Sequence, residues 1–393
     1  MTSAWLLPEH MADVLPSQAR RIEELRRGVL DTAARYGYEL VMPPLLEYLD
    51  SLLSGTGREL NLRTFKLVDQ LSGRSLGLRA DTTPQVARID AHLLNRDGVT
   101  RLCYCGPVAH ARPSGLQSSR EPLQFGAELY GHAGLEADLE VQDLALDSLR
   151  AVGLSGLVLD MADARIVRGL LHGLSIDAGR LDELYRALSA KDALALADVT
   201  HGYPDEVRRG LHSLLALYGD AEVLEAAAAA LPARPQVSAA LDDLKRLAAH
   251  ATVAHPQVTV GFDLSDFSGQ TYYSGARFAV YAEGCEQALL RGGRYDEIGA
   301  VFGRTRPAAG FSGDLKALAS MGAGVMPRKA VQAPWSEDAA LREVVRELRG
   351  AGHTVVCLLP GHEHEGDEVD CDRRIEWLGG RWQLREVTAR AAP

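Results

Sequence analysis

Near the N-terminus, apolar residues recur at helical spacing and then stop at a glycine. The repeat lies between Pro16 and Gly37, and Gly37 stands where a left-handed helix cap is common. Such a stripe is typical of an amphipathic helix with one face in a core, so we expect a helix over about residues 17–36. The residues of the stripe are Ile22, Leu25, Val29 and Leu30.

The segments after this helix have an extended pattern. YELVMPPLLEY contains Pro43 and Pro44, which donate no backbone hydrogen bond, so we expect an edge strand or an interface segment there. Residues 63–81 alternate around a Ser-Gly turn, which predicts a β-hairpin. A helix should begin near Thr83 and Pro84, because proline suits the first turn.

Two further strands are predicted at 101–111 and 123–131, joined by the polar stretch RPSGLQSSRE, which is long enough to contact a ligand. From Asp163 to Pro256 the composition shifts to Ala and Leu with little β-branching, which indicates a helical insertion over 163–256. Strands resume with QVTVGFDL and YYSGARFAVYA. GGRYD is predicted to be a turn with an inward Arg294 paired to Asp296 or a neighbour, and a helix is expected over 313–322.

A composition break after Pro327 divides the chain into a core, residues 1–327, and a short C-terminal segment, residues 328–393. In that segment we expect one helix over 337–349 and one strand at HTVVCLL. Blocks of strands with flanking helices, a helical insertion and a short α/β tail predict the α+β class.

Composition and charge narrow the functional classes. The chain has 393 residues, 46% hydrophobic and 24% charged, which excludes a disordered or fibrous protein. Its formal charge of −11 disfavours general nucleic-acid binding. The N-terminus lacks the pattern of a secretory signal and no 18-residue apolar stretch occurs, so we expect a cytoplasmic protein with no membrane partner. The five cysteines show no metal-site spacing and are expected to be reduced.

Six motifs in order resemble the histidyl-tRNA synthetase family, whose class II fold has an antiparallel sheet. GYELVMPPLLEY resembles the dimer-interface motif, LRADTTPQVAR the amino-acid-binding turn, and CGPVAHARPSGLQSSREPLQFGAELYG the second class II motif. TYYSGARF, GGRYD and AAGFSGDLKAL resemble the histidine-binding and third motifs. The match covers about residues 5–326, and six motifs in the right order are far more specific than any one alone.

The chain departs from this family where ATP is handled. Amino-acid activation needs fixed cations against the α-phosphate, because negative charge accumulates there. Three family arginines are replaced, by His110, Ser268 and Ala317, and Lys316 lies one position from the last. Arg112 stands where the family has a carboxylate, and Pro122 where it has the residue that stacks on adenine. Losing one such donor costs ~10²–10³ in rate, so we expect no adenylation, no catalytic residue and no cofactor.

The positions that hold the amino acid are retained. The resemblance implies that Asp81 and Thr83 hold an α-ammonium and that Gln124 and Glu128 hold the amino acid, with Tyr272 and Tyr273 closing an imidazole pocket. We therefore hypothesise a histidine-binding site. A structural role stays open for two of these residues: Asp81 as a helix N-terminal carboxylate and Glu128 as a buried ion-pair partner. His110 as a general acid or base is disfavoured.

The C-terminal segment GHEHEGDEVDC holds His, Glu, Asp and Cys residues, but their spacing fits no standard metal site, and we expect no metal. The C-terminal segment as a whole is short for an anticodon-binding domain, and this stretch of it is acidic. No tRNA is therefore expected.

A histidyl-synthetase-like core without ATP arginines is similar to the regulatory subunits of ATP phosphoribosyltransferase, a paralogous family of histidine biosynthesis. The resemblance implies a short-form catalytic subunit as partner, a self-dimer through the class II interface, a hetero-octamer of four plus four chains, and feedback inhibition by free histidine. Two alternatives stay open: an active histidyl-tRNA synthetase or other amino-acid ligase, and a scaffold with a vestigial pocket. The sequence leaves open whether histidine binds this chain, the catalytic chain or their interface.

Overall fold

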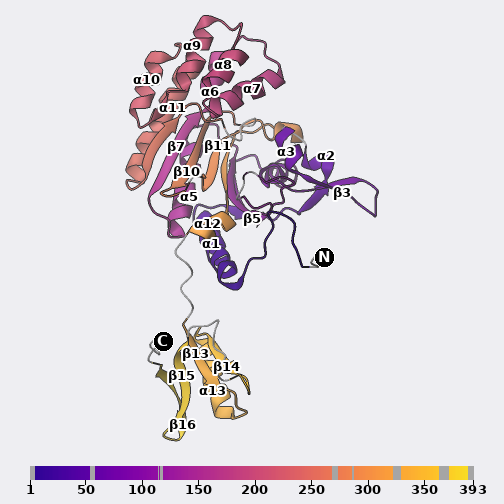
Figure 1. The fold of residues 1–393 in the computed structure, drawn as a ribbon, viewed down its shortest axis with the longest axis vertical. Coiled ribbons are helices and arrows are strands. Elements are labelled where there is room, and N and C mark those ends of the chain that lie inside the picture. The colour runs from indigo at the N-terminus through magenta and orange to yellow at the C-terminus, as the bar shows by residue number, and fades with distance from the viewer. Residues whose placement is uncertain are drawn as a thin grey trace. The chain divides into compact units, whose positions relative to one another are not determined.

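The computed structural model describes residues 5–53, 58–113, 115, 118–267, 273–285, 287–321, 329–362 and 371–387. The chain divides into two compact units, Met1–Gly322 and Ala323–Pro393 (Figure 1). Each unit has its own hydrophobic core and is described by itself.

A nine-stranded sheet organises the large unit. Its strand order is β1-β5-β6-β12-β11-β10-β7-β9-β8, and every pair is antiparallel except β1 with β5 and β7 with β9. Both outermost strands are only two residues long. The strands are β1 Glu39–Leu40, β5 Thr100–Pro107, β6 Leu123–Tyr130, β7 Leu157–Asp163, β8 Tyr218–Gly219, β9 Thr259–Asp263, β10 Ala276–Ala282, β11 Leu290–Arg294 and β12 Ala308–Asp314.

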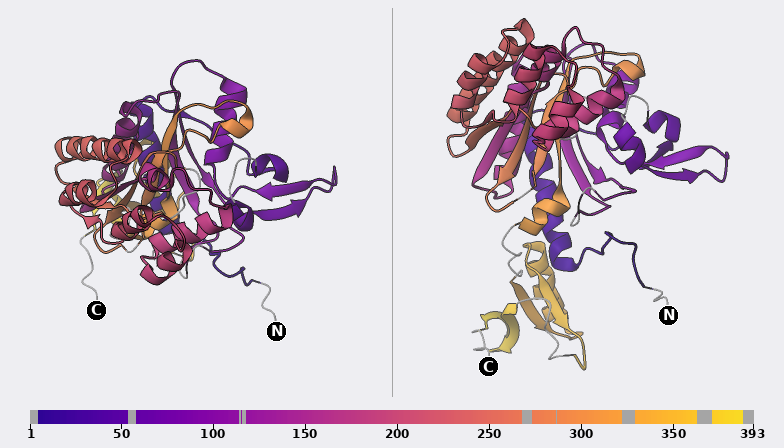
Figure 2. Two further views of the ribbon diagram at one scale, coloured as in Figure 1. Left: turned by 90° about the horizontal axis from the view of Figure 1, so that it is seen from above. Right: turned by 45° about the horizontal axis from the view of Figure 1, so that its top comes forward.

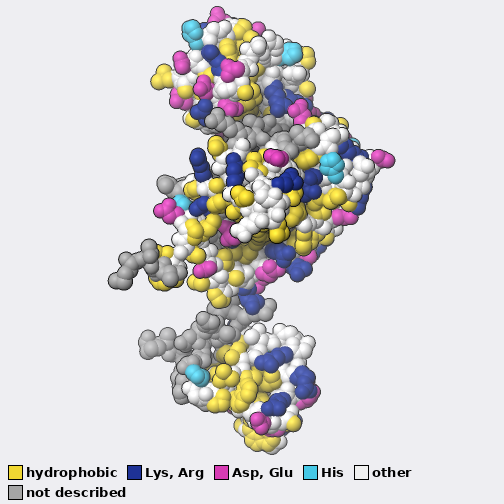
Figure 3. Space-filling view, turned by 90° about the vertical axis from the view of Figure 1, so that its right-hand side faces the viewer, with side chains coloured by type: hydrophobic (Ala, Val, Ile, Leu, Met, Phe, Trp, Pro, Cys, Tyr) yellow, Lys and Arg dark blue, Asp and Glu magenta, His cyan; other side chains and the backbone are white. Residues whose placement is uncertain are grey.

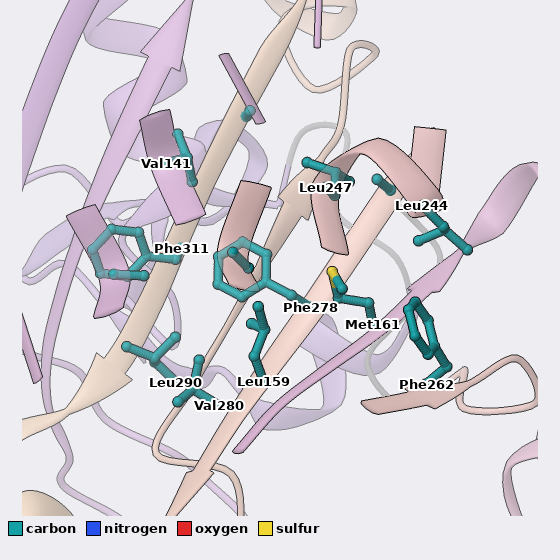
Figure 4. Packing of buried hydrophobic residues seen from close by; sticks show 14 of the residues in the cluster. Val141, Leu159, Met161, Leu244, Leu247, Phe262, Phe278, Val280, Leu290 and Phe311 are labelled. Carbon is teal, nitrogen blue, oxygen red and sulfur yellow. The ribbon is translucent and has the colours of Figure 1, made fainter. Parts of the chain in front are cut away.

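Helices pack on one face of this sheet because apolar residues alternate along its strands. The helices α5 (Glu136–Ala151) and α11 (Pro235–Ala254) contact β7, β10, β11 and β12, and α1 (Pro16–Arg35) packs on α5. Figure 4 shows the resulting core, in which side chains from sheet and helices meet. The core residues labelled there are Val141, Leu159, Met161, Leu244, Leu247, Phe262, Phe278, Val280, Leu290 and Phe311.

Between residues 163 and 256, all described, the chain is almost wholly helical, as the composition predicts. The helices are α6 Ala164–Leu171, α7 Ala178–Ser189, α8 Ala193–Val199, α9 Asp205–Leu214, α10 Glu222–Ala230 and α11, with only the two-residue β8 between them. Aspartates begin three of these helices: Asp163, Asp177 and Asp192 each accept a backbone N–H of the first turn.

A second, three-stranded sheet lies beside the large one. It comprises β2 (Leu46–Tyr48), β3 (Phe65–Val68) and β4 (Ser75–Leu78), so the predicted hairpin over residues 63–81 is confirmed. The hairpin projects from the large unit in the views of Figure 2. The short helices α2 (Leu49–Leu52) and α3 (Arg58–Arg63) precede it, and α4 (Thr83–Arg88) follows and continues as a π-helix over Ile89–Leu94.

The edge-strand prediction for the proline pair is also confirmed. β1 ends at Leu40, at the border of the large sheet, and Pro43 and Pro44 follow outside any strand. Their carbonyl oxygens accept hydrogen bonds from two buried side chains: Arg79 Nη1 donates to Pro43 at 2.8 Å and Gln85 Nε2 donates to Pro44 at 2.8 Å. Side-chain hydrogen bonds therefore anchor this segment where it makes no backbone hydrogen bonds to a neighbouring strand.

Two local predictions in the large unit need correction. The glycines of GGRYD lie within β11, because both neighbouring strands pair with them, and do not form a turn. The inward Arg294 does pair as expected, with Asp138 of α5 at 2.5 Å and with Asp296 at 3.3 Å. Tyr273 precedes β10 instead of lying in a strand, since pairing with β7 begins at Ala276.

The C-terminal unit has more strands than the sequence pattern suggested. It contains β13 (Ala330–Pro334), α13 (Ala339–Gly350), β14 (Val355–Leu358), β15 (Cys371–Leu378) and β16 (Arg381–Glu386), in the sheet order β14-β13-β15-β16. The helix and the strand at HTVVCLL are confirmed, but three strands were missed. The hairpin had a usable signal: charged and apolar residues alternate on both sides of Gly379 and Gly380, whose φ angles are positive.

Candidate functional site

The candidate site lies on the face of the large sheet opposite the core helices. Strand register places Glu128 of β6 beside Gly310 of β12, which in turn pairs with Gly293 of β11. A side chain at Gly310 would overlap Oε2 of Glu128 and the hydroxyl of Tyr295. Glycine at this position is therefore what allows the carboxylate to lie across the sheet surface.

Glu128 is the most deeply buried acid of the site, with 1% of its surface exposed. Its Oε1 accepts hydrogen bonds from Thr83 Oγ1 at 3.0 Å and from the Tyr104 hydroxyl at 3.2 Å. Its Oε2 has no hydrogen-bond partner among the described residues. Burial raises the pKa of Glu128 well above its ordinary range and the negative charge of Asp81 adds to this, although the bonds from Thr83 and Tyr104 act against it.

Asp81 and Gln124 form the adjoining part of the site. Gln124 Nε2 donates to Asp81 Oδ1 at 2.8 Å, and the Thr82 N–H donates to Gln124 Oε1 at 2.9 Å. The Thr83 N–H also donates to Asp81 Oδ1, at 3.1 Å, where α4 begins. The turn before α4 and the strand β6 are thus joined by side-chain hydrogen bonds.

The structure therefore brings together four of the six predicted residues, namely Asp81, Thr83, Gln124 and Glu128. Tyr273 is connected less directly: its ring lies edge-on to Tyr295, with ring centroids 6.4 Å apart, and Tyr295 reaches Gly310 beside Glu128. Tyr272 lies outside the described residues.

The two alternatives weighed for these residues differ in outcome. Asp81 does accept a backbone N–H at the start of α4, which agrees with a structural role. Glu128 has no cationic partner among the described residues, so the buried ion pair considered for it is absent there.

Two tyrosines of the site were not predicted. Tyr104 faces Gly126 across the β5–β6 pair, on the same face as Glu128, and Tyr295 follows β11 on that face. The alternation of the two predicted strands at 101–111 and 123–131 would have placed Tyr104 beside Glu128. The position of Tyr295 in the site was not predicted, because the GGRYD motif predicts a turn and not the end of a strand.

A larger open cleft of about 1000 Å³ adjoins this region, and its lining includes His110, Pro122 and Ala317. Its walls also include Met11 and Val14 of the N-terminal segment. The lysine and arginine side chains in its described lining are already paired: Lys316 with Glu121 at 3.1 Å, and Arg291 with Asp266 at 3.3 Å. Such an arrangement offers little to a polyphosphate.

His110, at the position of the lost motif-two arginine, is buried with 7% of its surface exposed. Its Nδ1 and Nε2 lie 3.2 and 3.3 Å from Arg63 Nη2, and Nε2 lies 3.0 Å from the Ala80 carbonyl oxygen. Burial lowers the pKa of His110 to about 4, the Arg63 charge adds to this, and the Ala80 carbonyl acts against it. The ring is therefore neutral at pH 7 and does not replace the missing cation. Arg112 is exposed, and Ser268 lies outside the described residues.

Among the described residues, no group of three or more His, Cys, Asp or Glu side chains is arranged to hold a metal ion. Most of the segment GHEHEGDEVDC falls outside the described residues. None of the helices that the structure describes combines the length and apolarity needed to cross a membrane.

Family models match nearly the whole chain. Residues 10–318 match the model described as histidyl-tRNA synthetase, and residues 328–385 match the model described as the C-terminal domain of ATP phosphoribosyltransferase subunit HisZ.

Several highly similar curated relatives share one description. An ATP phosphoribosyltransferase regulatory subunit of Variovorax paradoxus is 62% identical over 390 residues, which cover 98% of this chain and 100% of the relative. One from Verminephrobacter eiseniae is 59% identical over 389 residues, with 98% and 100% covered.

Solved structures agree with the predicted fold. A Bacillus halodurans protein described as an ATP phosphoribosyltransferase regulatory subunit/histidyl-tRNA synthetase has a TM-score of 0.80 at 27% identity, covering 91% of this chain and 94% of its own. A histidyl-tRNA synthetase from Nostoc has a TM-score of 0.78 at 19% identity, with 95% and 92% covered, and shows the fold alone. The expected α+β, class II synthetase-like architecture is confirmed.

The environment of His110 predicts a pH dependence of stability. Its pKa is about 4 in the folded chain and ordinarily 6.5, so the unfolded chain binds more protons between these values. The free energy of unfolding should therefore fall as pH drops from about 6.5 to about 4, with His110 contributing at most about 3 kcal/mol. Denaturant unfolding of His110→Gln at several pH values should show a smaller acid loss than the parent chain. His172→Gln, at an exposed position, should behave like the parent; equal acid losses in all three would contradict the assignment.

Proposed function

Since this chain belongs to the family of ATP phosphoribosyltransferase regulatory subunits, we propose that it is the non-catalytic partner of a short-form catalytic subunit in the first step of histidine biosynthesis. The proposal includes a requirement for this chain in the activity of the catalytic subunit, a cytoplasmic hetero-octamer of four plus four chains, and no binding of tRNA. The names of the relatives support the partnership.

One contrast supports the non-catalytic part of the proposal: the residues that the resemblance assigns to the amino acid are joined by hydrogen bonds, whereas the positions that it assigns to ATP contacts lack arginine. Asp81, Thr83, Gln124 and Glu128 are held by one hydrogen-bond network. In the adjoining cleft His110 is neutral at pH 7, and Lys316 is paired with Glu121. Phosphoryl and adenylyl chemistry depends on electrostatic stabilisation, which these residues do not supply.

We further propose that the network is a histidine sensor. Oε2 of Glu128 is buried with no partner among the described residues, and an imidazole N–H would supply the donor that it lacks. Asp81 is half-buried at the end of the same network and suits an α-ammonium. Tyr272 and Tyr273 belong to this hypothesis as the closing side of the pocket.

An active synthetase or amino-acid ligase is the rival function, and the fold alone does not distinguish it, since the Nostoc synthetase shares that fold. A scaffold with a vestigial pocket is the second rival. One observation favours the scaffold: Asp81 and Gln124 accept hydrogen bonds from backbone N–H groups and so also stabilise the turn before α4.

Restoring two of the lost arginines should not restore activation. The double variant His110→Arg, Ala317→Arg still lacks the arginine at Ser268 and keeps Arg112 and Pro122, and catalytic groups act as a unit. We expect no histidine-dependent ATP–pyrophosphate exchange from the parent chain or from the double variant, with a genuine histidyl-tRNA synthetase as positive control. Robust exchange by the parent chain would overturn the non-catalytic assignment.

Asp81→Asn tests the sensor. Asparagine keeps an oxygen that accepts from Gln124 and Thr83, but it removes the charge opposite the ligand's ammonium. Because Asp81 is half-buried, we expect a loss of about 2 kcal/mol, or roughly 30-fold more histidine for half-inhibition of the complex. Phosphoribosyl transfer without histidine should be nearly unchanged, since the effector acts through differential affinity for two states.

Asp182→Asn, an exposed change on α7, is the matched control and should leave inhibition unaltered. If Asp81→Asn is inhibited like the parent, the effector site lies elsewhere. If it loses basal activity as well, Asp81 serves the fold, and the scaffold alternative is favoured.

We also propose dimerisation through the segment around the proline pair. Between Leu40 and Tyr48 large apolar side chains are exposed, among them Met42 at 72%, and the neighbouring hairpin exposes Leu67 and Val68. Figure 3 views the molecule from the side on which the hairpin lies and shows hydrophobic side chains at the surface there. Several exposed apolar side chains on neighbouring segments are typical of a protein interface.

Met42→Glu should weaken that dimer, because it buries a charge in an apolar interface, while the exposed side chain leaves the free chain intact. Sedimentation at micromolar concentration should give a dimer for the parent chain and monomer for the variant. Leu194→Glu, which makes the same change at an exposed leucine on α8, should sediment like the parent. A monomeric parent chain would contradict the proposed dimer.

A further inference from the structure

The sheet of the C-terminal unit has a helix on one face only, within the part of that unit that the structure describes. Leu341 and Val345 of α13 pack on one face. At the N-terminal end of α13, Trp382 closes this face, and its Nε1 donates to Asp338 Oδ2 at 2.6 Å. The sheet residues in this core are Val331, Ala333, Val355 and Ile375.

Alternation assigns the neighbouring residues to the other face, which we call the open sheet face. It includes Gln332, Val356, Leu358, Arg374, Glu376, Arg381 and Arg385. A side-chain hydrogen bond supports the assignment, since Arg374 Nε donates to Gln332 Oε1 at 2.9 Å across β15 and β13. The face has two halves: half-buried Val356 and Leu358 on β14, and three exposed arginines on β15 and β16.

The arginines are arranged at an electrostatic cost. Arg374 and Arg385 are direct cross-strand partners, and like charges in that relation repel. Glu376 is the acid beside them, 3.9 Å from Arg374 and roughly half exposed. In a chain of formal charge −11 a basic sheet face is a local exception, and an acidic surface laid over it would remove the repulsion.

We propose that the open sheet face binds an acidic amphipathic helix of the catalytic subunit. An open sheet face with a partly apolar half is ordinarily covered by a helix, as α13 covers the opposite face. The apolar half fits the apolar stripe of such a helix and the arginines fit its acidic flank. The inference rests on the proposed function, because it takes its partner from there.

Arg385→Glu separates binding from folding. In the free chain it replaces a repulsive pair with an attractive one, so the melting temperature of the chain should stay level or rise slightly. In the complex it places a negative charge against an acidic helix, so the Kd for the catalytic subunit should rise about tenfold or more, and less so at high salt. Weaker binding without any loss of stability is a combination that a merely structural residue would not produce.

Arg346→Glu is the matched control. It makes the same change of charge on α13, at a side chain 71% exposed, away from the open sheet face. Its Kd should stay within about twofold of the parent value. Equal Kd values for Arg385→Glu and Arg346→Glu would overturn the inference while leaving the partnership intact, whereas a parent chain that does not bind the catalytic subunit would overturn both.

Two other occupants of the open sheet face would give different results with Arg385→Glu. If an acidic segment of this chain covers the face, Arg385→Glu lowers the melting temperature of the free chain by several degrees. If the face binds RNA, bulk tRNA binds the parent chain, competes with the catalytic subunit, and no longer binds Arg385→Glu. Either result would overturn the inference.

Discussion

The large unit depends on a sheet that buries one face under α5 and α11 and, on its other face, combines a second apolar cluster with the polar side chains of the candidate site. The two-residue period of β-strands sends Leu159, Phe278 and Phe311 toward α5 and α11. The same period sends Glu128 and Tyr104 to the opposite face, where Gly310 and Gly126 leave room for them. A one-residue slip in register would exchange the two sets and destroy core and site together.

Sequence patterns were sufficient for elements with strong periodicity. The first helix, the hairpin, the strands at 101–111 and 123–131 and the helical stretch between 163 and 256 follow from spacing and composition, and the structure contains each. The gathering of Asp81 with Gln124 and Glu128 does not follow from spacing, because it depends on how the turn before α4 meets β6. Only the resemblance to a family suggested it.

The misses have physical causes. In GGRYD the glycines suggested a turn, but their lack of side chains serves close packing: a Cβ at Gly292 or Gly293 would meet backbone atoms of the neighbouring strands. In the C-terminal unit, Arg374, Arg381 and Arg385 lie on the open sheet face, and Ile375, Trp382 and Leu384 lie on the other. The many charged residues of β15 and β16 obscure this period of two in the sequence, so no strand is predicted there.

The lengths of the outermost strands limit how the large sheet can polymerise. β1 and β8 each contribute two residues, and the proline pair follows β1 before the chain could extend that edge. Unpaired strand edges are templates for amyloid-like growth, and short edges closed by proline offer few free backbone groups to an incoming strand. The short outer strands therefore protect the sheet against edge-to-edge aggregation.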